Sequence, residues 1–265
     1  SLKMLIDSAI FALFIQIRNY AEMTNIPEKP ILVTGGANGI GRAITEHLVS
    51  TGAIVGILDI NAEGIANTCE DIATSGHHCL GLQADITNYN DVKAAVENFE
   101  QQAGAPVYGL VNNAGSDRAM PFIKSNPGFW DQVIDINLKG PLNVTHACLP
   151  GMIKQGCGRV VTIASDAGRV GSSGEAVYSA TKGGMIALMK TLAREHTRHG
   201  ITFNSVCPGP TDTPFLAEFD KESGGKLVQA LKKSIPMKRL AQPTDFPALI
   251  EYFLSEEANY VTGQT

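Results

Sequence analysis

The stretch PILVTGGANGIGRAITEHLVS, residues 30–50, passes from an apolar run through a glycine-rich loop into an amphipathic pattern. The apolar run is typical of a buried strand and the later pattern of a helix. Between a strand and a helix, the first glycine permits a tight turn, the second allows close approach of a pyrophosphate, and the third lets the helix pack near the strand. The stretch therefore predicts a dinucleotide-binding loop at a helix N-terminus. Its predicted binding residues are Gly35, Asn38, Gly39, Ile40 and Gly41.

The remaining sequence repeats this rhythm of apolar runs and helical patterns. Runs that are apolar on both faces are typical of parallel strands covered by helices on both sides. We therefore expect residues 23–265 to form one α/β domain, a single doubly wound parallel sheet of the Rossmann type with helices on both faces. The further strand-like runs lie within 53–60, 79–85, 107–115, 158–166 and 201–210.

Composition narrows the class of partner. The net charge of -5, with Lys and Arg scattered along 265 residues, argues against nucleic acid or an anionic membrane surface as a partner. The five cysteines are an odd count without a C-x-x-C motif, so we expect a reducing, cytoplasmic setting. His77 and His78 precede Cys79, but no second cluster matches them, and no metal site is predicted.

The two ends of the chain depart from the expected domain. Residues 4–17 are mostly apolar, are interrupted by Asp7, and are too few to span a bilayer comfortably. An amphipathic or membrane-surface helix is one interpretation. We favour Met23 as the natural start, with residues 1–22 an N-terminal appendage outside the fold. At the other end, the sequence stops at YVTGQT, residues 260–265, where one more strand would be expected.

Asp59 ends the second apolar run. A carboxylate there can accept hydrogen bonds from the adenosine ribose hydroxyls and would repel a 2′-phosphate. The residues that follow, Ile60 and Asn61, supply no compensating cation. This pattern favours NAD over NADP, although an Asp can also stand at a strand end by chance.

Tyr178 and Lys182 are four residues apart at the start of a predicted helix. That spacing places both side chains on one helix face, within reach of a common ligand. A surface pair that arose by chance is the alternative for this spacing alone. The surrounding motifs decide between the two interpretations.

Five motifs occur in a fixed order. They are T-G-x-x-x-G-x-G (34–41), N-N-A-G (112–115), Ser165, Y-x-x-x-K (178–182) and P-G (208–209). In this order the chain resembles the short-chain dehydrogenase/reductase family from about residue 29 to its end. The resemblance implies that Tyr178 is the general acid/base, that Lys182 favours the phenolate and binds the nicotinamide ribose, and that Ser165 holds the substrate oxygen. Asn137 resembles the fourth catalytic position of the family.

The same resemblance implies the rest of the cofactor cleft. The segment 112–115 should line it, Asp85 and Ile86 should lie near the adenine ring, and the hydroxyls after the P-G motif should meet the carboxamide or pyrophosphate. Ile60 and Val206 lie beside these positions. The predicted cofactor contacts are Asp59, Ile60, Asp85, Ile86, Asn112, Ala114, Gly115, Tyr178, Lys182, Pro208, Gly209, Thr211 and Thr213.

Two local features suggest further roles. Pro141 has no N–H, so the carbonyl of Asn137 cannot receive its usual helical hydrogen bond from that position. The freed carbonyl could hold a water that links Lys182 to solvent, or the proline could be a kink without a chemical role. The polar segment 211–236 follows a strand end and is either a lid or a solvated helical excursion.

The segments 163–184 and 191–213 resemble family members that oxidise 2-hydroxycyclohexanecarboxyl-CoA. That likeness implies an NAD-dependent oxidoreductase for a secondary alcohol, either a cyclic alcohol or a hydroxyacyl-CoA. Three cations could bind a CoA phosphate, or they could be solvated surface charges. The cations are Arg118, Lys124 and Arg169. The resemblance also implies a homo-oligomer, with a tetramer favoured.

Three rival functions stay open. A 3-oxoacyl thioester reductase is disfavoured by Asp59, because biosynthetic reductases usually use NADP. A catalytically idle NAD-binding redox sensor or scaffold should have lost one of Ser165, Tyr178 and Lys182, and the chain keeps all three. A membrane-associated interaction protein would rest on the apolar N-terminal segment alone.

Overall fold

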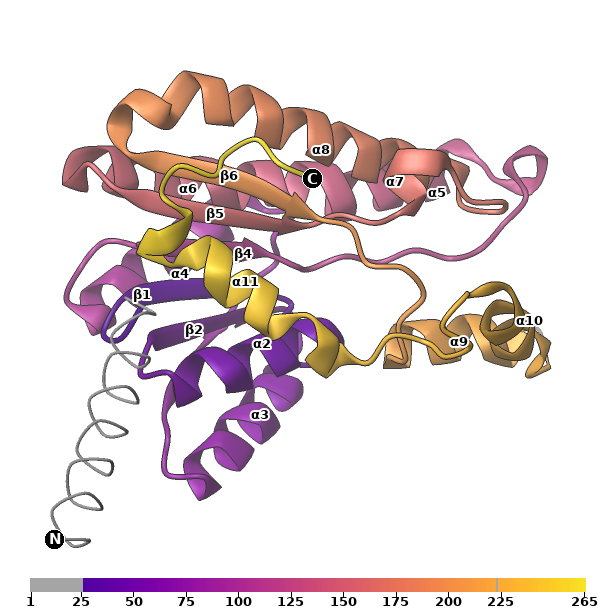
Figure 1. Ribbon diagram of the computed structural model, residues 1–265, viewed down its shortest axis with the longest axis horizontal. Helices are drawn as coiled ribbons and strands as arrows, with labels where there is room; N and C mark the ends of the chain where they lie inside the picture. Colours follow the sequence, from indigo (N-terminus) through magenta and orange to yellow (C-terminus); the bar gives the residue numbers. More distant parts are fainter. Residues whose placement is uncertain (1–25, 223) are drawn as a thin grey trace, which may run out of the picture.

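The computed structural model describes residues 26–222 and 224–265. Within these ranges six parallel strands form one sheet, in the order β3-β2-β1-β4-β5-β6 (Figure 1). The predicted appendage of residues 1–22 and the predicted start at Met23 lie outside the described residues. The strands are β1 (Pro30–Thr34), β2 (Ile54–Asp59), β3 (Cys79–Gln83), β4 (Gly109–Asn112), β5 (Gly158–Ile163) and β6 (Ile201–Val206).

The strand order confirms the doubly wound topology. The chain begins in the middle of the sheet with β1, winds outward to β3, returns to pair β4 with β1, and winds outward in the other direction to β6. The direction of winding reverses between β1 and β4, and open α/β sheets bind ligands beyond the strand carboxyl ends at such a point. All five strand pairs are parallel, so these carboxyl ends share one edge.

Three long helices cover one face of the sheet: α4 (Tyr89–Ala103), α6 (Gly140–Gln155) and α8 (Ala176–His196). They bury Phe99, Met152 and Met185 against strand residues such as Leu32 and Phe203. Residues of β1 alternate between the two faces, as the pleat of a strand requires: Leu32 packs on this face, and Ile31 and Val33 pack on the other. The apolar faces of the helices therefore fix this layer to the sheet.

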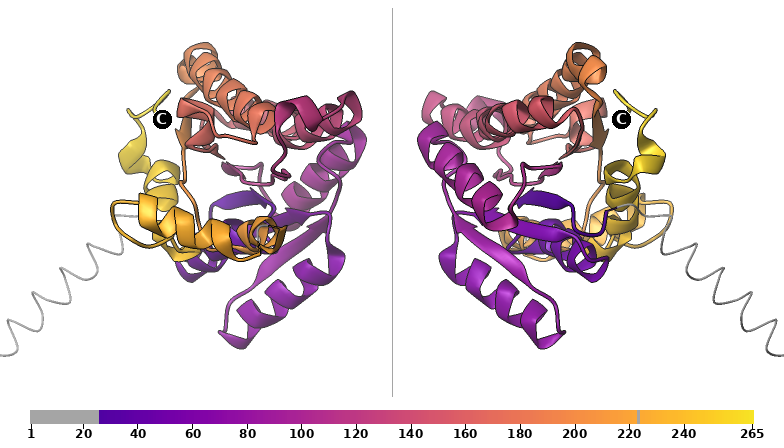
Figure 2. Two further views of the ribbon diagram at one scale, coloured as in Figure 1. Left: turned by 90° about the vertical axis from the view of Figure 1, so that its right-hand side faces the viewer. Right: turned by 90° about the vertical axis from the view of Figure 1, so that its left-hand side faces the viewer.

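The opposite face is covered by α2 (Gly39–Ser50), α3 (Ala62–Thr74) and α11 (Pro247–Leu254). Ile44, Leu48 and Leu254 pack there against Ile31 and Val33 of β1. The two layers lie on opposite sides of the sheet (Figures 1 and 2). Helices on both faces are what the sequence pattern predicted.

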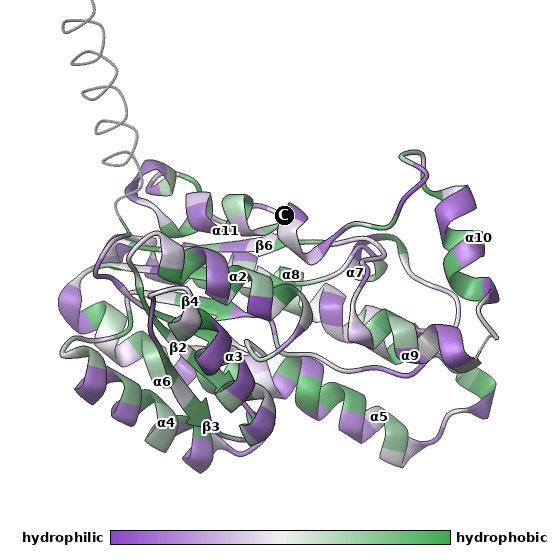
Figure 3. Ribbon diagram, turned by 90° about the horizontal axis from the view of Figure 1, so that it is seen from below, coloured by the Kyte–Doolittle hydropathy of each residue, from purple (hydrophilic) through white to green (hydrophobic). Residues whose placement is uncertain are grey.

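Shorter elements connect the strands and the long helices. In Figure 1, α9 and α10 lie beyond the carboxyl edge of the sheet, at the right of the molecule. Hydropathy colouring shows largely hydrophobic strands, whereas the outer helices carry both hydrophilic and hydrophobic residues (Figure 3). The shorter elements are η1 (Phe122–Lys124), α5 (Pro127–Ile134), η2 (Asp135–Lys139), α7 (Ala167–Val170), η3 (Thr197–His199), α9 (Pro214–Glu222), α10 (Lys226–Ser234), η4 (Pro243–Asp245) and η5 (Glu256–Ala258).

The irregularity expected at Pro141 is a turn of π-helix. The turn η2 spans Asp135–Lys139 and connects α5 to α6, with Asn137 at its centre. Single π-turns inside α-helices are uncommon and change which backbone groups are paired. The proline stands at the second position of α6, where its missing N–H is tolerated.

The last described residues run beside the outer edge of β6. The backbone N–H of Gly263 donates to the carbonyl of Phe203 at 2.7 Å, and that of Ser205 donates to Gln264 at 2.9 Å. The described segment 259–265 forms no strand of its own. Two ladder-like hydrogen bonds nevertheless occupy the β6 edge there.

None of the helices in the described ranges is long and apolar enough to cross a membrane.

Candidate active site

A cavity of about 1070 Å³ lies where the strands end. Its lining comes from the segments that follow β1, β2, β3, β4, β5 and β6, together with α5, α8 and the α9–α10 segment. The cavity thus stands at the carboxyl edge, beside the point where the strand order reverses. This is the position that the Rossmann prediction requires.

The glycine-rich loop forms one wall of the cavity. Gly35 has φ +64°, and a Cβ there would stand 2.8 Å from the Cα of Ala114. Gly39 also has a positive φ, +54°, and lines the cavity. Gly41 does not line it: a Cβ on Gly41 would overlap the carbonyl oxygen of Gly35. The third glycine therefore permits close packing of α2, and the first two leave the backbone open to a ligand.

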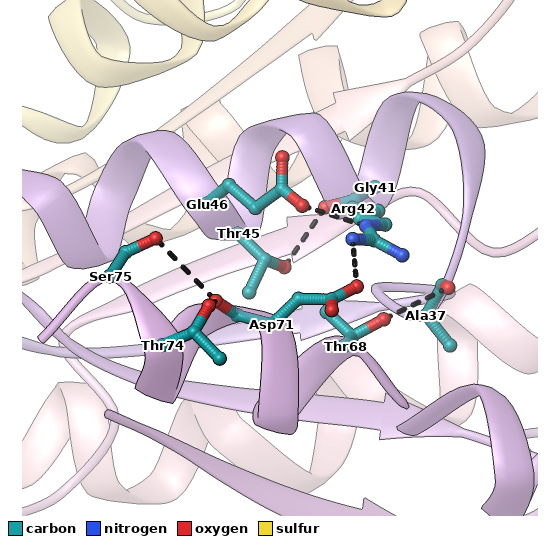
Figure 4. A network of polar contacts seen from close by, with 9 residues as sticks. All are labelled: Ala37, Gly41, Arg42, Thr45, Glu46, Thr68, Asp71, Thr74 and Ser75. Carbon is teal, nitrogen blue, oxygen red and sulfur yellow. Dashed lines mark hydrogen bonds and ion pairs between the residues drawn. The ribbon is translucent and has the colours of Figure 1, made fainter. Parts of the chain in front are cut away.

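Polar contacts between α2 and α3 hold this loop from behind (Figure 4). The hydroxyl of Thr68 on α3 donates to the carbonyl of Ala37 in the loop at 3.1 Å. Arg42 pairs with Glu46 at 2.7 Å and with Asp71 of α3 at 2.6 Å. Since Arg42 is engaged with these two carboxylates, it is not among the residues that line the cavity.

Asp59 lies at the end of β2 and lines the cavity. One carboxylate oxygen accepts from the backbone N–H of Ala37 at 3.2 Å, and the other accepts from Asn61 at 3.0 Å. These bonds fix the carboxylate beside the glycine loop. Ile60 is 65 % exposed and also lines the cavity.

The loop after β4 interlocks with the glycine loop. The hydroxyl of Thr34 accepts from the backbone N–H groups of Asn113 and Ala114, both at 3.0 Å. The side chain of Asn113 donates to the carbonyls of Thr34 and Gly35 at 3.1 Å each. Ala114 and Gly115 line the cavity as predicted.

Asn112, predicted as a cofactor contact, is placed differently. It is 2 % exposed, does not line the cavity, and donates to the hydroxyl of Thr145 on α6 at 2.9 Å. Its neighbour Asn113 lines the cavity instead. Successive strand residues point to opposite faces, so only one of two adjacent asparagines can face the cleft.

The segment after β3 contributes Asp85 and Ile86, and both line the cavity. A carboxylate oxygen of Asp85 accepts from the backbone N–H and the hydroxyl of Thr87, each at 2.8 Å. This pair of bonds orients the Asp85 carboxylate within its own turn. Asn143 of α6 supports the turn by donating to the carbonyl of Ile86 at 2.9 Å.

Ser165, Tyr178 and Lys182 meet at the cavity. Ser165 follows β5 and hydrogen-bonds the phenol of Tyr178 on α8. The Lys182 Nζ lies 5.5 Å from the centroid of the Tyr178 ring. Gly168 of α7 lets α8 approach closely, because a Cβ there would stand 2.9 Å from the Cβ of Lys182.

Burial governs the protonation of this group. It raises the pKa of Tyr178 above its ordinary value; the Ser165 hydrogen bond acts in the opposite direction, and nearby Glu175 and Asp117 raise the pKa further. Burial lowers the pKa of Lys182 to about 8, although the electrostatic interaction with Cys207 acts to raise it. Burial is the largest influence on the pKa of both groups.

Asn137 is completely buried and does not line the cavity. Its amide donates to the carbonyls of Ser116 and Val133, and its oxygen accepts from the backbone N–H of Ser116 at 3.2 Å. A Cβ on Gly115 would stand 2.8 Å from the Asn137 oxygen and 3.4 Å from the Lys182 Nζ. Asn137 therefore holds the loop after β4 next to Lys182.

The segment after β6 closes the other side of the cavity. Pro208, Gly209, Thr211 and Thr213 all line it, whereas Val206 does not. The Thr211 hydroxyl donates to the Gly209 carbonyl at 2.9 Å, and the backbone N–H of Asp166 donates to Pro208 at 3.1 Å. The turn is thereby tied to the end of β5.

The segment expected as a lid reaches the cavity through apolar side chains. Two of them come from α9 and two from α10. A solvated excursion would keep such residues away from the cleft, so this lining favours the lid over that alternative. The four residues are Phe215, Leu216, Leu227 and Leu231.

Charge in the cavity is mostly negative. Lys182 is the single Lys or Arg in its described lining, whereas five carboxylates line it. The cations proposed for a CoA phosphate are absent from the lining, and Arg169 lies 3.7 Å from Asp166. Across the described chain no group of His, Cys, Asp or Glu could hold a metal ion. The five carboxylates are Asp59, Asp85, Asp135, Asp166 and Glu175.

Sequence reasoning missed several lining residues. Gln132 and Asp135 come from α5 and η2, and Glu175 precedes α8. No motif marks them, because tertiary packing alone brings α5 beside α8. The proximity of Glu175 to Tyr178 was a usable signal, since the two residues are only three positions apart in the sequence.

The arrangement can perform proton transfer beside a dinucleotide site. A phenol and a hydroxyl share one face of the cavity, next to a buried amine and a loop whose glycines leave room for a ligand. A carbonyl or alcohol oxygen placed between the two hydroxyls could exchange a proton with Tyr178. That geometry suits redox chemistry at an alcohol carbon.

The comparisons with known proteins agree with this geometry. The sequence profile of the short chain dehydrogenase family matches residues 29–224. The oxidoreductase UcpA of Salmonella typhimurium is 35 % identical over 246 residues, which are 91 % of this chain and 93 % of UcpA. The acetoacetyl-CoA reductase of Synechocystis is 36 % identical over 240 residues, 90 % of this chain and 94 % of that protein.

A solved structure of an actinorhodin polyketide ketoreductase variant with NADPH has the same fold. It superposes with a TM-score of 0.85 at 31 % sequence identity, and the match covers 89 % of this chain and 94 % of that one.

Proposed function

The chain belongs to the short-chain dehydrogenase family, and on that premise we propose that it is an NAD-dependent oxidoreductase that interconverts a secondary alcohol and its ketone. The observation that carries the proposal is the meeting of Ser165, Tyr178 and Lys182 at one cavity with the glycine loop. When bound, the nicotinamide cofactor accepts or supplies the hydride.

The loop fits such a cofactor. Gly35 and Gly39 adopt positive φ values and present backbone to the cavity at the start of α2, where the helix dipole favours a pyrophosphate. The carboxylate of Asp59 stands beside this loop, ready to accept hydrogen bonds from ribose hydroxyls. Arg42 is paired with Glu46 and Asp71. Lys182 is the single Lys or Arg in the described lining, and it stands with Ser165 and Tyr178, so among the described lining residues no cation next to Asp59 neutralises a 2′-phosphate. This electrostatic argument supports NAD over NADP.

The proposed proton path runs through Tyr178. In alcohol oxidation Tyr178 receives the hydroxyl proton, and in ketone reduction it donates a proton to the carbonyl oxygen. Ser165 donates to the same substrate oxygen and keeps it within reach of the phenol. Lys182 holds the nicotinamide end of the site, and Asn137 positions the loop beside Lys182.

For the substrate, we favour an uncharged cyclic or otherwise apolar secondary alcohol within the cavity. Apolar groups from α9 and α10 line the cavity, and its carboxylates would repel an anionic substrate body. A hydroxyacyl-CoA stays compatible if its phosphates lie outside the cavity. The predicted homotetramer and cytoplasmic location remain predictions, and light scattering during size-exclusion chromatography would test the former.

The second candidate is a 3-oxoacyl thioester reductase. It is favoured by the 36 % identity to a protein named acetoacetyl-CoA reductase. The two candidates differ in the cofactor that we expect: NAD for the alcohol dehydrogenase and NADP for the reductase. The solved structure of a ketoreductase relative contains NADPH. An idle sensor or scaffold has no need for the preserved Ser165, Tyr178 and Lys182 group.

The test is an assay of NADH or NADPH formation by purified protein with cyclic alcohols, hydroxyacyl-CoA thioesters and simple secondary alcohols. The reverse reaction is assayed with the matching ketones and 3-oxoacyl thioesters. We expect turnover with NAD and a cyclic or secondary alcohol, which Tyr178→Phe abolishes. Tyr260→Phe is the matched control, because Tyr260 is 96 % exposed and outside the cavity lining. Binding of NADH without turnover of any substrate would favour the idle sensor.

A further inference from the structure

Two cysteines at the edge of the sheet lie in contact. The sulfur of Cys69 on α3 is 2.9 Å from that of Cys79, the first residue of β3. Both thiols are free and both side chains are partly buried. β3 is the outermost strand, so the pair stands at a border of the sheet and not in its centre.

We propose that Cys69 and Cys79 are a site of oxidation, at which hydrogen peroxide converts the two thiols into an intramolecular disulfide that links α3 to β3. A disulfide has an S–S length of about 2.0 Å, so bond formation brings the two sulfurs closer by roughly 1 Å. Helix α3 already packs on β3, and Ile65 of α3 is buried next to both cysteines. The fold therefore holds the pair together before any bond forms.

The disulfide forms in two steps, and the same product results whichever cysteine begins. Burial raises the pKa of the Cys79 thiol. When Cys69 begins, it reacts as a thiolate, the nucleophilic form of the side chain. It attacks one oxygen of hydrogen peroxide, the O–O bond breaks, and hydroxide leaves with the electron pair, giving a sulfenic acid at Cys69.

The second step completes the bond. The sulfur of Cys79 attacks the sulfenic sulfur of Cys69, the S–O bond breaks, and the departing hydroxide takes the Cys79 proton as water. In total two thiols lose two protons and two electrons, and one peroxide becomes two waters. Hydrogen peroxide is small enough to reach a partly buried pair.

The link would join two elements that flank the proposed adenosine end of the cavity. α3 begins directly after Asp59 and Asn61, and β3 leads into Asp85 and Ile86. Thr68 on α3 also holds the glycine loop through Ala37. Oxidation would therefore fasten the helix and strand that carry these lining residues.

The test is peptide mapping of the intact full chain after oxidation. Reduced protein is treated with hydrogen peroxide, free thiols are alkylated before unfolding, and the protein is digested without reductant. Trypsin leaves both cysteines in one peptide, because no Lys or Arg lies between Arg42 and Lys93. A protease that cleaves after Glu70 separates them. We expect a linked pair of peptides that reductant splits.

Variants assign the bond. Cys69→Ser and Cys79→Ser should each abolish the linked peptides, whereas Cys157→Ser, which removes another partly buried thiol, should leave them unchanged. Recovery of Cys69 and Cys79 as alkylated thiols from oxidised protein overturns the proposal. Linkage of either cysteine mainly to Cys157 or Cys207 overturns it equally. The readout needs no enzymatic turnover, so it is independent of the proposed function.

Thermal unfolding gives a second measurement. A loop of ten residues closed in the native geometry should raise the Tm of the oxidised protein by roughly 5 to 10 °C over the reduced protein. Cys69→Ser should show no such shift after the same treatment. A lower Tm for the oxidised wild-type protein would show that the native geometry does not accommodate the bond.

Discussion

The Lys182 ammonium donates a hydrogen bond to the carbonyl oxygen of Ile163 at 3.0 Å, at the end of β5. The side chain is 4 % exposed, no carboxylate of the described residues pairs with it, and burial lowers its pKa to about 8. A buried ammonium costs free energy of folding. The residue that serves the proposed chemistry is therefore a source of instability.

We expect Lys182→Met to increase the free energy of unfolding at pH 7 by about 2 kcal/mol, since the cost of the buried charge exceeds the lost hydrogen bond. The cost is fully present below pH 8 and is relieved as pH rises from about 8 to 10.5, because only the unfolded state stays protonated in that range. Urea unfolding should show a smaller difference in the free energy of unfolding between variant and wild type at pH 10 than at pH 7. Lys190→Met, at an exposed position of α8, is the control.

Replacing Asp117 should move the pH profile of alcohol oxidation. Asp117 does not line the cavity, but its charge and that of Glu175 raise the pKa of Tyr178. The pKa of Asp117 is itself raised to about 7 by burial, so its charge is present above neutral pH. Asp117→Asn removes the charge, the pKa of Tyr178 falls, and the rise of kcat/KM with pH should occur at lower pH.

The measurement is kcat/KM for alcohol oxidation across the alkaline range. The exposed variant Asp131→Asn on α5 should keep the wild-type profile. A profile for Asp117→Asn that moves to higher pH would contradict the electrostatic explanation.

Asp59→Asn should weaken discrimination between the two cofactors. The amide oxygen can still accept from Ala37, so the loop stays in place, but the charge that would repel a 2′-phosphate is gone. A charge-assisted hydrogen bond to ribose is also lost, which corresponds to about a tenfold rise in the Kd for NADH. Fluorescence titration with NADH and NADPH measures both effects. Asp91→Asn, exposed on α4, is the control, and an unchanged Kd ratio in Asp59→Asn would count against NAD selectivity.

Phe99→Ala should destabilise the domain by about 3 to 5 kcal/mol. Phe99 of α4 is fully buried, and its ring lies so close to β2 that a Cβ on Gly56 would stand 2.7 Å from it. Urea unfolding provides the measurement. Ile123→Ala, at a side chain 91 % exposed, should change stability by less than about 0.5 kcal/mol.

The features of the site that depend on local sequence patterns were predicted from the sequence. Gly35 and Gly39 face the cavity because a strand, a turn and a helix follow one another within a few residues. The helical spacing of Tyr178 and Lys182 likewise places both at the cavity. The doubly wound parallel sheet was predicted from the alternation of apolar runs and helical patterns.

What depended on packing between distant elements was missed. Of two adjacent asparagines, Asn113 faces the cavity and Asn112 the opposite side, and the sequence pattern does not give the phase of the pleat. The sequence likewise does not give the pKa of Tyr178, because burial depends on everything that surrounds the side chain. Gln132 reaches the cavity only through the placement of α5, for which no motif exists.

The bonds between Thr34 and Asn113 join segments that are 79 residues apart in the chain. Such non-local pairing forms slowly, because the intervening loop must close before the contacts stabilise it. The glycine loop gains its final shape only when β4 has docked beside β1. Competence to bind a dinucleotide should therefore appear late during refolding, together with the complete sheet, and would serve as a kinetic marker of the last folding step.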